Sequence, residues 1–410
     1  MLKLLIILSA IFTISAIELS VQHSEIRKTI IDSYLEGSPK ELFKVFHYLF
    51  QKPYDINSEI ALAKYKVFKS NLQFIKEHNA KKLSWTLEVN FFADMTLDQI
   101  KSYLGATQEQ SKTTVSELLE GKNFDIFDRL VEENQDENDK KRHLQALSFF
   151  DAYADSNDEV PSKRFDESLT KTYDDIDHSQ YLNPVRDQGF CSANWVFSAL
   201  TSIEGTYNYR RSLKKSDDRV AALSVQQIID CNMNRWGCMG AGNTGAREAI
   251  KQVAFSGVSL DSDYPYVASQ NMSCNFNTAK VDSLKFNQEK PIKGCHWNDS
   301  EIKSKCDKKT WYNLLKDGPV VTFIELDMNF SFYSGGVIDL SMRNCTSPYF
   351  NLVAFAWTNE VVEEKSTGRE IISLRNFAGA GWGENGNIRY YYNKNGTCFI
   401  TQAAFLPNLK

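Results

Sequence analysis

The sequence lacks cysteine before Cys191, where the first of eight appears. Histidine is scarce as well, and His296 is the only one beyond position 194. Basic residues are not in excess, since the formal net charge is -5, which argues against a nucleic-acid-binding protein. Beyond the N-terminus no run is long and apolar enough to span a membrane. Hydrophobic residues nevertheless make up 42% of the chain, which is enough for a sizeable core.

Residues 1–16 have the features of a secretory signal peptide. Lys3 supplies a positive start, an apolar run extends from Leu4 to Ile14, and small residues follow. We therefore expect a mature protein in the extracellular space or in a lysosome- or vacuole-like lumen, where cysteines form disulfides. Asn-x-Ser/Thr sequons agree with a glycosylated surface; they begin at Asn271, Asn298, Asn329, Asn344 and Asn395.

The pattern of apolar and charged residues divides the rest of the chain. Residues 17–105 contain apolar positions at three- and four-residue steps, notably from Glu59 to Lys81, which predicts helices, and Thr96 can cap a further one. Residues 106–159 are acidic and polar, which predicts a linker with one helix near 114–131. Within this linker Lys140-Lys141-Arg142 is either a processing site or a solvated charge run.

Residues 160–410 have the mixed composition of a compact domain. From Asn194 to Arg211, apolar residues recur at a spacing that places them on one face of a helix, which predicts a helix packed into the core. A helical half (about 160–290) and a β half (291–410) predict an α+β fold with a cleft between two subdomains. The expected strands are runs of β-branched and aromatic residues at 319–323, 352–355, 371–374 and 388–391.

Three segments of this domain carry distinctive motifs. Residues 184–199 read Pro-Val-Arg-Asp-Gln-Gly-Phe-Cys-Ser-Ala-Asn-Trp-Val-Phe-Ser-Ala, and residues 375–386 read Arg-Asn-Phe-Ala-Gly-Ala-Gly-Trp-Gly-Glu-Asn-Gly. In residues 231–242, two cysteines with six residues between them precede Met-Gly-Ala-Gly. These segments resemble the nucleophile segment, the asparagine segment and the cleft loop of the papain family of cysteine peptidases, in particular its cathepsin L-like members. The resemblance implies the papain-like fold of two subdomains.

The upstream region resembles the inhibitory prosegment of the same family. The spacing of its central helix is matched by Lys64, Phe68, Asn71, Ile75 and Asn79. The Asn-x-Phe-x-Asp motif that follows is matched by Asn90, Phe92 and Asp94. Ile60 stands where the family usually has Glu, and Glu88 where it has Gly. The resemblance implies that the prosegment lies in the substrate cleft.

The same resemblance indicates that the catalytic machinery is missing. The family needs a cysteine thiolate at the start of the central helix, where the helix dipole favours it. Asn194 occupies that position, and Trp195 after it fixes the register. The family's histidine falls on Phe350, or on Asn351 if the weaker match shifts by one residue, and neither can act as the base. His296 lies far too early in the chain to replace it.

Supporting residues of the family site remain in part. Gln188 corresponds to the oxyanion-hole glutamine and Asn376 to the residue that orients the histidine, whereas Ala378 replaces a shielding tryptophan. The resemblance places further residues at the cleft: Gly240, Ala241, Phe377, Ala378 and Trp382. It also implies the disulfides Cys191–Cys238, Cys231–Cys274 and Cys345–Cys398.

Cys295 and Cys306 are left over from that pairing. We expect them to form a fourth disulfide, because a metal site with His296 would lack a fourth ligand. No cofactor and no metal is therefore expected.

Three functions remain open at this level. The first is a non-catalytic protein that binds its own prosegment and a peptide or protein ligand, because loss of such a nucleophile or base costs on the order of 10⁶ in turnover. The second is an active cathepsin-type endopeptidase, which the similarity over the whole chain favours. The third is a structural or storage glycoprotein without a cleft ligand.

A chain without nucleophile and base cannot remove its own prosegment. Purified full-length protein should keep its length on a denaturing gel in both acidic and neutral buffer. Removal in cells should need another protease that cuts between about residue 106 and Val160. Shortening that proceeds in the purified protein and is blocked by an inhibitor of papain-like enzymes would contradict this prediction.

Overall fold

The computed structural model describes residues 26–105 and 173–410, with gaps at 217–218, 233–235, 243, 271–272, 275–280, 282, 297–305, 340–349, 363–364, 393–399 and 401–402. Several expectations therefore lie outside the described residues: the signal peptide 1–16, the linker 106–159 with its helix and basic triplet, and the Cys345–Cys398 pair. The same holds for the sequons at Asn271, Asn298, Asn344 and Asn395.

The N-terminal part is built on two helices, α3 (Pro39–Leu49) and α4 (Glu59–Ala80). The expected helix from residue 59 is confirmed, and Ser58 caps it by accepting a hydrogen bond from the Ala61 N–H. Strand β1 (Trp85–Leu87), the 3₁₀ helix η1 (Phe91–Asp94) and helix α5 (Leu97–Leu104) follow. Thr96 and Gln99 form a capping box at the start of α5, as the sequence predicts.

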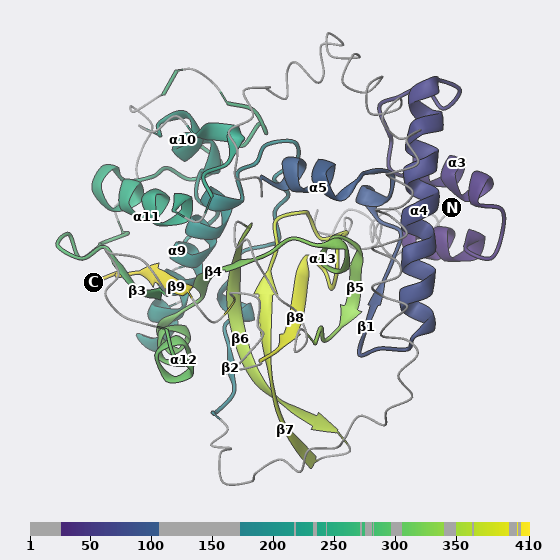
Figure 1. Cartoon of the computed structure of the whole chain (residues 1–410). Helices are drawn as coiled ribbons and strands as arrows, with labels where there is room; N and C mark the ends of the chain where they lie inside the picture. Colours follow the sequence, from purple (N-terminus) through teal and green to yellow (C-terminus); the bar gives the residue numbers. More distant parts are fainter. Residues whose placement is uncertain are drawn as a thin grey trace, which may run out of the picture. The chain divides into compact units, whose positions relative to one another are not determined.

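Asparagine side chains connect α4 to the segment that follows it. The Asn71 Nδ2 donates to the carbonyls of Ala93 (3.0 Å) and Met95 (2.9 Å). The Asn79 amide bonds both the N–H and the C=O of Leu87, at 2.9 and 2.8 Å. Both side chains satisfy backbone groups of β1, η1 and the residue after η1, which would otherwise cost free energy if buried without a partner. The amides therefore fix the path of the chain that leads to α5 (Figure 1).

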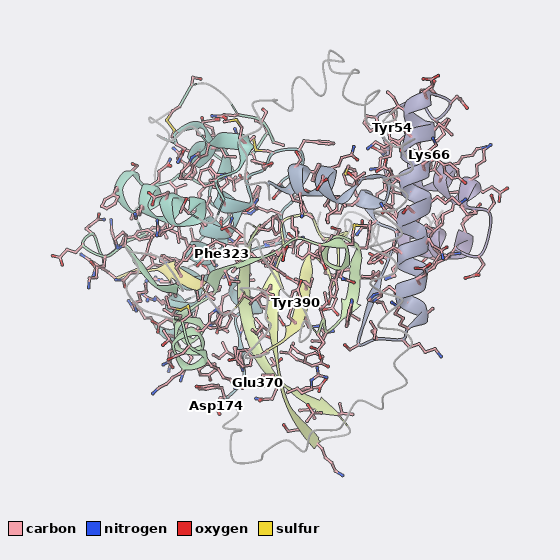
Figure 2. The ribbon with its side chains drawn as sticks, viewed as in Figure 1. Tyr54, Lys66, Asp174, Phe323, Glu370 and Tyr390 are labelled. Carbon is pink, nitrogen blue, oxygen red and sulfur yellow. A yellow bond between two sulfur atoms is a disulfide. The ribbon has the colours of Figure 1, made fainter. Side chains whose placement is uncertain are left out.

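Asp94, at the end of η1, forms a buried ion pair with Lys52 (2.9 Å) and accepts a hydrogen bond from the Tyr54 hydroxyl (2.7 Å). Figure 2 shows Tyr54 beside α4. Burial lowers the pKa of Lys52 to about 8, although Asp94 opposes this effect. The Lys52 Nζ also lies 3.7 Å from the ring centre of Phe91. This cluster anchors η1 to the loop after α3.

The helical half of the domain is organised around α9 (Asn194–Leu213). This helix is buried on nearly every side from Asn194 to Asn208, as expected of a helix that runs through a core. Helices α10 (Val225–Asp230) and α11 (Gly245–Ser256) pack on it. The helix expected at this position is thereby confirmed.

The β half contains an antiparallel sheet with the strand order β3-β9-β4-β6-β7-β8, and β2 (Ile176–Asp177) also pairs with β6. The four expected strands are present as β4 (Val320–Ile324), β6 (Phe350–Val362), β7 (Lys365–Arg375) and β8 (Asn387–Tyr391). Strands β3 (Ile292–His296) and β9 (Ala403–Pro407) complete it. Helix α12 (Lys308–Asp317) packs against β3 and β9, and α13 (Met328–Phe332) leads into β5 (Tyr333–Gly336).

Strand β4 separates two hydrophobic cores. Val321 and Phe323 on one face belong to the core of α9, whereas Val320 and Ile324 on the other face belong to the core of the β half. Side chains alternate between faces along a strand, so both faces of β4 are buried. Figure 2 shows Phe323 on β4 and Tyr390 on β8, one in each core.

The prosegment adds a strand to the β half. Strand β1 pairs antiparallel with β5, and Trp85 lies opposite Gly336. A side chain on Gly336 would meet the Ser84 carbonyl oxygen at 2.2 Å, and its φ of +90° also favours glycine. Asn90 Nδ2 donates to the Ser331 carbonyl at 2.8 Å, which ties η1 to α13. These contacts hold the chain that precedes α5 against β5 and α13.

A buried charge network holds the segment before α9. Glu204 on α9 is 1% exposed and accepts hydrogen bonds from Arg186 (3.1 Å), Asn183 (3.0 Å) and the Leu223 N–H (2.7 Å). Burial raises the pKa of Glu204, and Arg186 counteracts that rise. Because the hydrogen bonds and charge of Glu204 are matched by Asn183 and Arg186, residues 183–186 are held against α9.

The part of the chain that the structure describes contains no helix with the length and apolarity that a membrane crossing requires. The one described sequon, at Asn329, is not freely presented. The Asn329 Nδ2 donates to Asp327 at 3.0 Å, and Ser331, the third residue of the sequon, is fully buried.

The buried His178 predicts a loss of stability in acid. Its Nε2 lies 2.7 Å from the Leu315 carbonyl, and burial lowers the pKa of its ring below the ordinary 6.5. As the pH falls below about 6.5, the unfolded chain takes up a proton that the folded chain refuses, so the free energy of unfolding decreases. The variant His178→Gln should lose part of this decrease, measured by urea unfolding at pH values above and below 6.5. Burial also lowers the pKa of His78, which remains in the variant. Equal pH dependence of the two proteins would contradict the prediction.

Candidate functional site

Asn194 is the first residue of α9 and is 1% exposed. The turn before it is held by the disulfide Cys191–Cys238 and by a hydrogen bond from the Ser192 N–H to the Cys238 carbonyl (3.0 Å). Trp195 donates its indole N–H to the Gly237 carbonyl at 3.2 Å. These contacts bring the loop around Gly240 against the N-terminus of α9.

The side chain of Asn351 on β6 faces Asn194. The Asn351 Nδ2 donates to the Asn194 Oδ1 at 2.8 Å, and the Asn351 backbone N–H points to the same oxygen at 3.3 Å. The Asn351 Nδ2 also donates to the Gly242 carbonyl at 3.1 Å. Both asparagines are almost fully buried. They form a pair of carboxamides where α9, β6 and the Gly240 loop meet.

The expectation that Phe350 lies beside Asn194 is wrong, and the shift by one residue describes the structure. Asn351 lies opposite Phe323 on β4, which faces α9, whereas Phe350 lies opposite Ile324, which faces the other core. Adjacent strand residues point to opposite faces, so only one of the two can reach α9. Phe350 is fully buried against Phe330, with ring centres 5.4 Å apart.

The end of the prosegment lies on this site. The Asn194 Nδ2 donates to the Leu104 carbonyl at 2.6 Å. The Ser192 Oγ donates to the carbonyls of Ser102 (3.2 Å) and Tyr103 (3.4 Å), and the Gln188 Nε2 approaches the latter oxygen at 3.4 Å. Three side-chain donors therefore meet three consecutive peptide carbonyls at the end of α5. The Ser102 carbonyl also accepts the Gly105 N–H at 3.2 Å, whereas the carbonyls of Tyr103 and Leu104 lie in the last turn, where a helix leaves its carbonyls without an intrahelical partner.

Glycines allow the close approach of the two segments. Gly105 ends α5 with a φ of +76°, and a Cβ there would lie 2.5 Å from the Ser192 Cβ. A Cβ on Gly240, whose φ is +85°, would lie 3.3 Å from the Gly105 oxygen. Backbone thus packs on backbone at this point, and both positions have conformations that favour glycine.

The other expected site residues are distributed differently. Asn376 is fully buried; its Oδ1 accepts the Phe377 N–H at 2.8 Å, and its Nδ2 has no partner among the described residues. With the prosegment in place, Phe377 and Trp382 are both buried in hydrophobic cores: Phe377 stacks on Phe197, and Trp382 packs on Phe330. Half-buried Ala378 bridges to Asp187, and half-buried Ala241 packs with the α9 core.

Aromatic rings cover the outer side of the site. Tyr103 of α5 packs against Phe190 and Phe91, with ring centres 5.1 and 5.7 Å apart. Burial, together with Asp187, raises the pKa of Tyr103. Burial likewise raises the pKa of Asp187, which accepts the Gly189 N–H at 2.8 Å. Gln188 meets Tyr103 at its backbone carbonyl, a contact that motif reasoning did not anticipate.

No thiol is available for chemistry in the described part of the chain, since all six of its cysteines are paired. Cys231–Cys274 and Cys295–Cys306 are both present, which removes the sulfur ligands of the weaker metal hypothesis. Among the described residues, no group of three or more His, Cys, Asp or Glu side chains is arranged to hold a metal.

Comparison with known proteins agrees with this geometry. Residues 169–408 match the family model described as papain family cysteine protease, and residues 43–100 match the cathepsin propeptide inhibitor domain (I29). Relatives include papain of Carica papaya, 25% identical over 86% of this chain and 82% of its own. Cathepsin K of Mus musculus is 30% identical over 58% of this chain, and falcipain-2b of Plasmodium falciparum is 26% identical over 84%.

The chain spans 62% of the length of falcipain-2b and 65% of cathepsin K. Among solved structures, the proform of the ragweed cysteine protease Amb a 11 aligns with a TM-score of 0.63 and 21% identity, over 92% of this chain and 97% of that one. A procathepsin L 3 of Tenebrio molitor aligns with a TM-score of 0.62 and 21% identity, over 91% and 100%. Both are structures with the same α+β fold, and the prosegment of this chain likewise occupies the site. The chain therefore belongs to the papain family of cysteine proteases and carries a cathepsin propeptide inhibitor domain ahead of the protease-like domain.

Proposed function

We propose that this papain-family homologue is proteolytically inactive and acts by binding a peptide or protein segment at the site around Asn194. The observation that carries the proposal is the Asn194–Asn351 pair at the N-terminus of α9. A papain-type reaction needs a thiolate and an imidazole at these two positions. Two carboxamides supply neither a nucleophile nor a base.

The remaining elements cannot restore turnover. Gln188 still offers a side-chain N–H, but an oxyanion donor alone gives roughly 10³–10⁴ over the rate in water. His178, which lies near the site in sequence, bonds the Leu315 carbonyl and is buried next to α12. Peptide hydrolysis in water is too slow for such a remnant to matter.

Binding, in contrast, is well supported by the same residues. Ser192, Gln188 and Asn194 direct three donors at the successive carbonyls of Ser102, Tyr103 and Leu104, so the site binds the last turn of a helix through its backbone, irrespective of its side chains. Two of these side chains, Gln188 and Asn194, are at most 1% exposed. A hydrogen bond between buried groups that would otherwise be unsatisfied is costly to break.

The second candidate is an active cathepsin-type endopeptidase, favoured by the similarity to papain over most of both chains. It would need a nucleophile that the described site does not contain. We also propose, from the disulfides and the apolar leader, that the protein is exported to the cell exterior or to a lysosome-like lumen and carries sugars at Asn271, Asn298, Asn344 and Asn395.

Restoring the two missing groups should restore chemistry. The full chain, with a specific protease site introduced between residues 110 and 140 and cut there, should not hydrolyse a broad fluorogenic peptide panel. The double variant Asn194→Cys, Asn351→His should gain turnover and react with an epoxide inhibitor of papain-like enzymes. Adding the base should raise turnover roughly 10²–10⁴-fold over Asn194→Cys alone.

The matched control is Asn194→Cys combined with Phe350→His, which places imidazole on the other face of β6 and should show no such gain. Turnover by the unaltered chain that thiol reagents block would overturn the proposal. An equal gain in both double variants would show that Asn351 is not the position of the base.

A further inference from the structure

We infer that Asn194 and Asn351 form a clamp for a peptide carbonyl that is followed by glycine, and that residues 102–105 of the same chain are its resident ligand. The inference rests on the proposed function and specifies the ligand of that site. The ligand class is the C-terminal turn of a peptide helix that ends in a Leu-Gly-like step, recognised through its backbone.

The hydrogen bonds determine which way the Asn194 amide points. Its oxygen receives two N–H groups from Asn351, one from the side chain (2.8 Å) and one from the backbone (3.3 Å). Only the Oδ1 can accept them, so the Nδ2 must face the other direction, where the Leu104 carbonyl lies at 2.6 Å. Asn351 is therefore a positioning residue: it holds the Asn194 side chain so that its Nδ2 donates to the Leu104 carbonyl.

The position of the clamp in the fold strengthens it. Asn194 begins a helix of 20 residues, and the N-terminus of a helix favours partial negative charge such as a carbonyl oxygen. Two independent donors, Ser192 and Gln188, engage the preceding carbonyls. A thiol at position 194 would be a much weaker donor, so the exchange of Cys for Asn adds binding where it removes chemistry.

The requirement for glycine follows from space and from backbone conformation. A Cβ at position 105 would approach the Ser192 Cβ to 2.5 Å and the Asn194 Nδ2 to 3.2 Å, at a φ of +76° that disfavours other residues. Neither neighbour can move freely, because Ser192 is held next to the Cys191–Cys238 disulfide and Asn194 is held by Asn351. The clamp thus selects its ligand by backbone shape.

Hydrogen exchange of the full chain, read by mass spectrometry over residues 97–105, tests the clamp. Asn194→Asp keeps the shape and still accepts from Asn351, but it replaces the donor to Leu104 with an oxygen. Exchange of α5 should become roughly 10- to 100-fold faster, because a buried acceptor loses its partner. Asn351→Leu, which frees the Asn194 amide to rotate, should have the same effect. The control is Asn208→Ala, which removes a buried amide elsewhere on α9 that bonds Tyr181 and Val220. It should not raise the exchange rate of α5 specifically.

Glycine selection has its own matched pair. Gly105→Ala should raise the rate of hydrogen exchange of α5 by the same factor. Gly368→Ala, at a similar φ of +75° but with nothing within 4 Å of the added Cβ, should leave that rate unchanged. Unchanged exchange over 97–105 in both Asn194→Asp and Gly105→Ala would overturn the clamp. The proposed function would survive that result if the cut chain still showed no turnover, so the two failures are distinguishable. Should either variant lose the fold, as judged by exchange in β4 and β6, Asn351→Leu decides the question.

Discussion

The contact on which the site depends is the hydrogen bond from the Asn194 amide to the Leu104 carbonyl at the N-terminus of α9. It requires a helix start, a strand and an incoming chain end to meet within a few ångströms. The Cys191–Cys238 disulfide fixes the first, and the pairing of β6 with β4 fixes the second. The third is the end of α5, whose final carbonyl, at Leu104, has no intrahelical partner because of helix geometry.

The prosegment reaches the site through backbone contacts made in advance. Strand β1 pairs with β5, Asn90 bonds the Ser331 carbonyl, and the asparagines of α4 fix the chain between them. Each step satisfies backbone groups, so the arrangement depends little on side-chain identity. The proforms of Amb a 11 and of procathepsin L 3 have the same fold.

The site also contains buried polar atoms that lack a hydrogen-bond partner among the described residues. The Gln188 Oε1, the Asn351 Oδ1 and the Asn376 Nδ2 are buried, and no described residue offers them a hydrogen bond. Such atoms cost free energy in a core, roughly 1–3 kcal/mol each.

The sequence by itself determined the family, the helices that begin at Glu59, Leu97 and Asn194, and four strands of the sheet. It also led to the proposal that Asn194 stands at the position of the nucleophile, because local motifs such as Gln-Gly-Phe-Cys fix the register around it. It could not decide between Phe350 and Asn351, since both lie in an apolar strand with a weak match. Only the pairing of β6 with β4 decided which of them faces α9. It also could not show that Phe377 and Trp382 are core residues, or that Leu104 lies on Asn194, because contacts between distant segments follow from packing and leave no periodic signal in the chain.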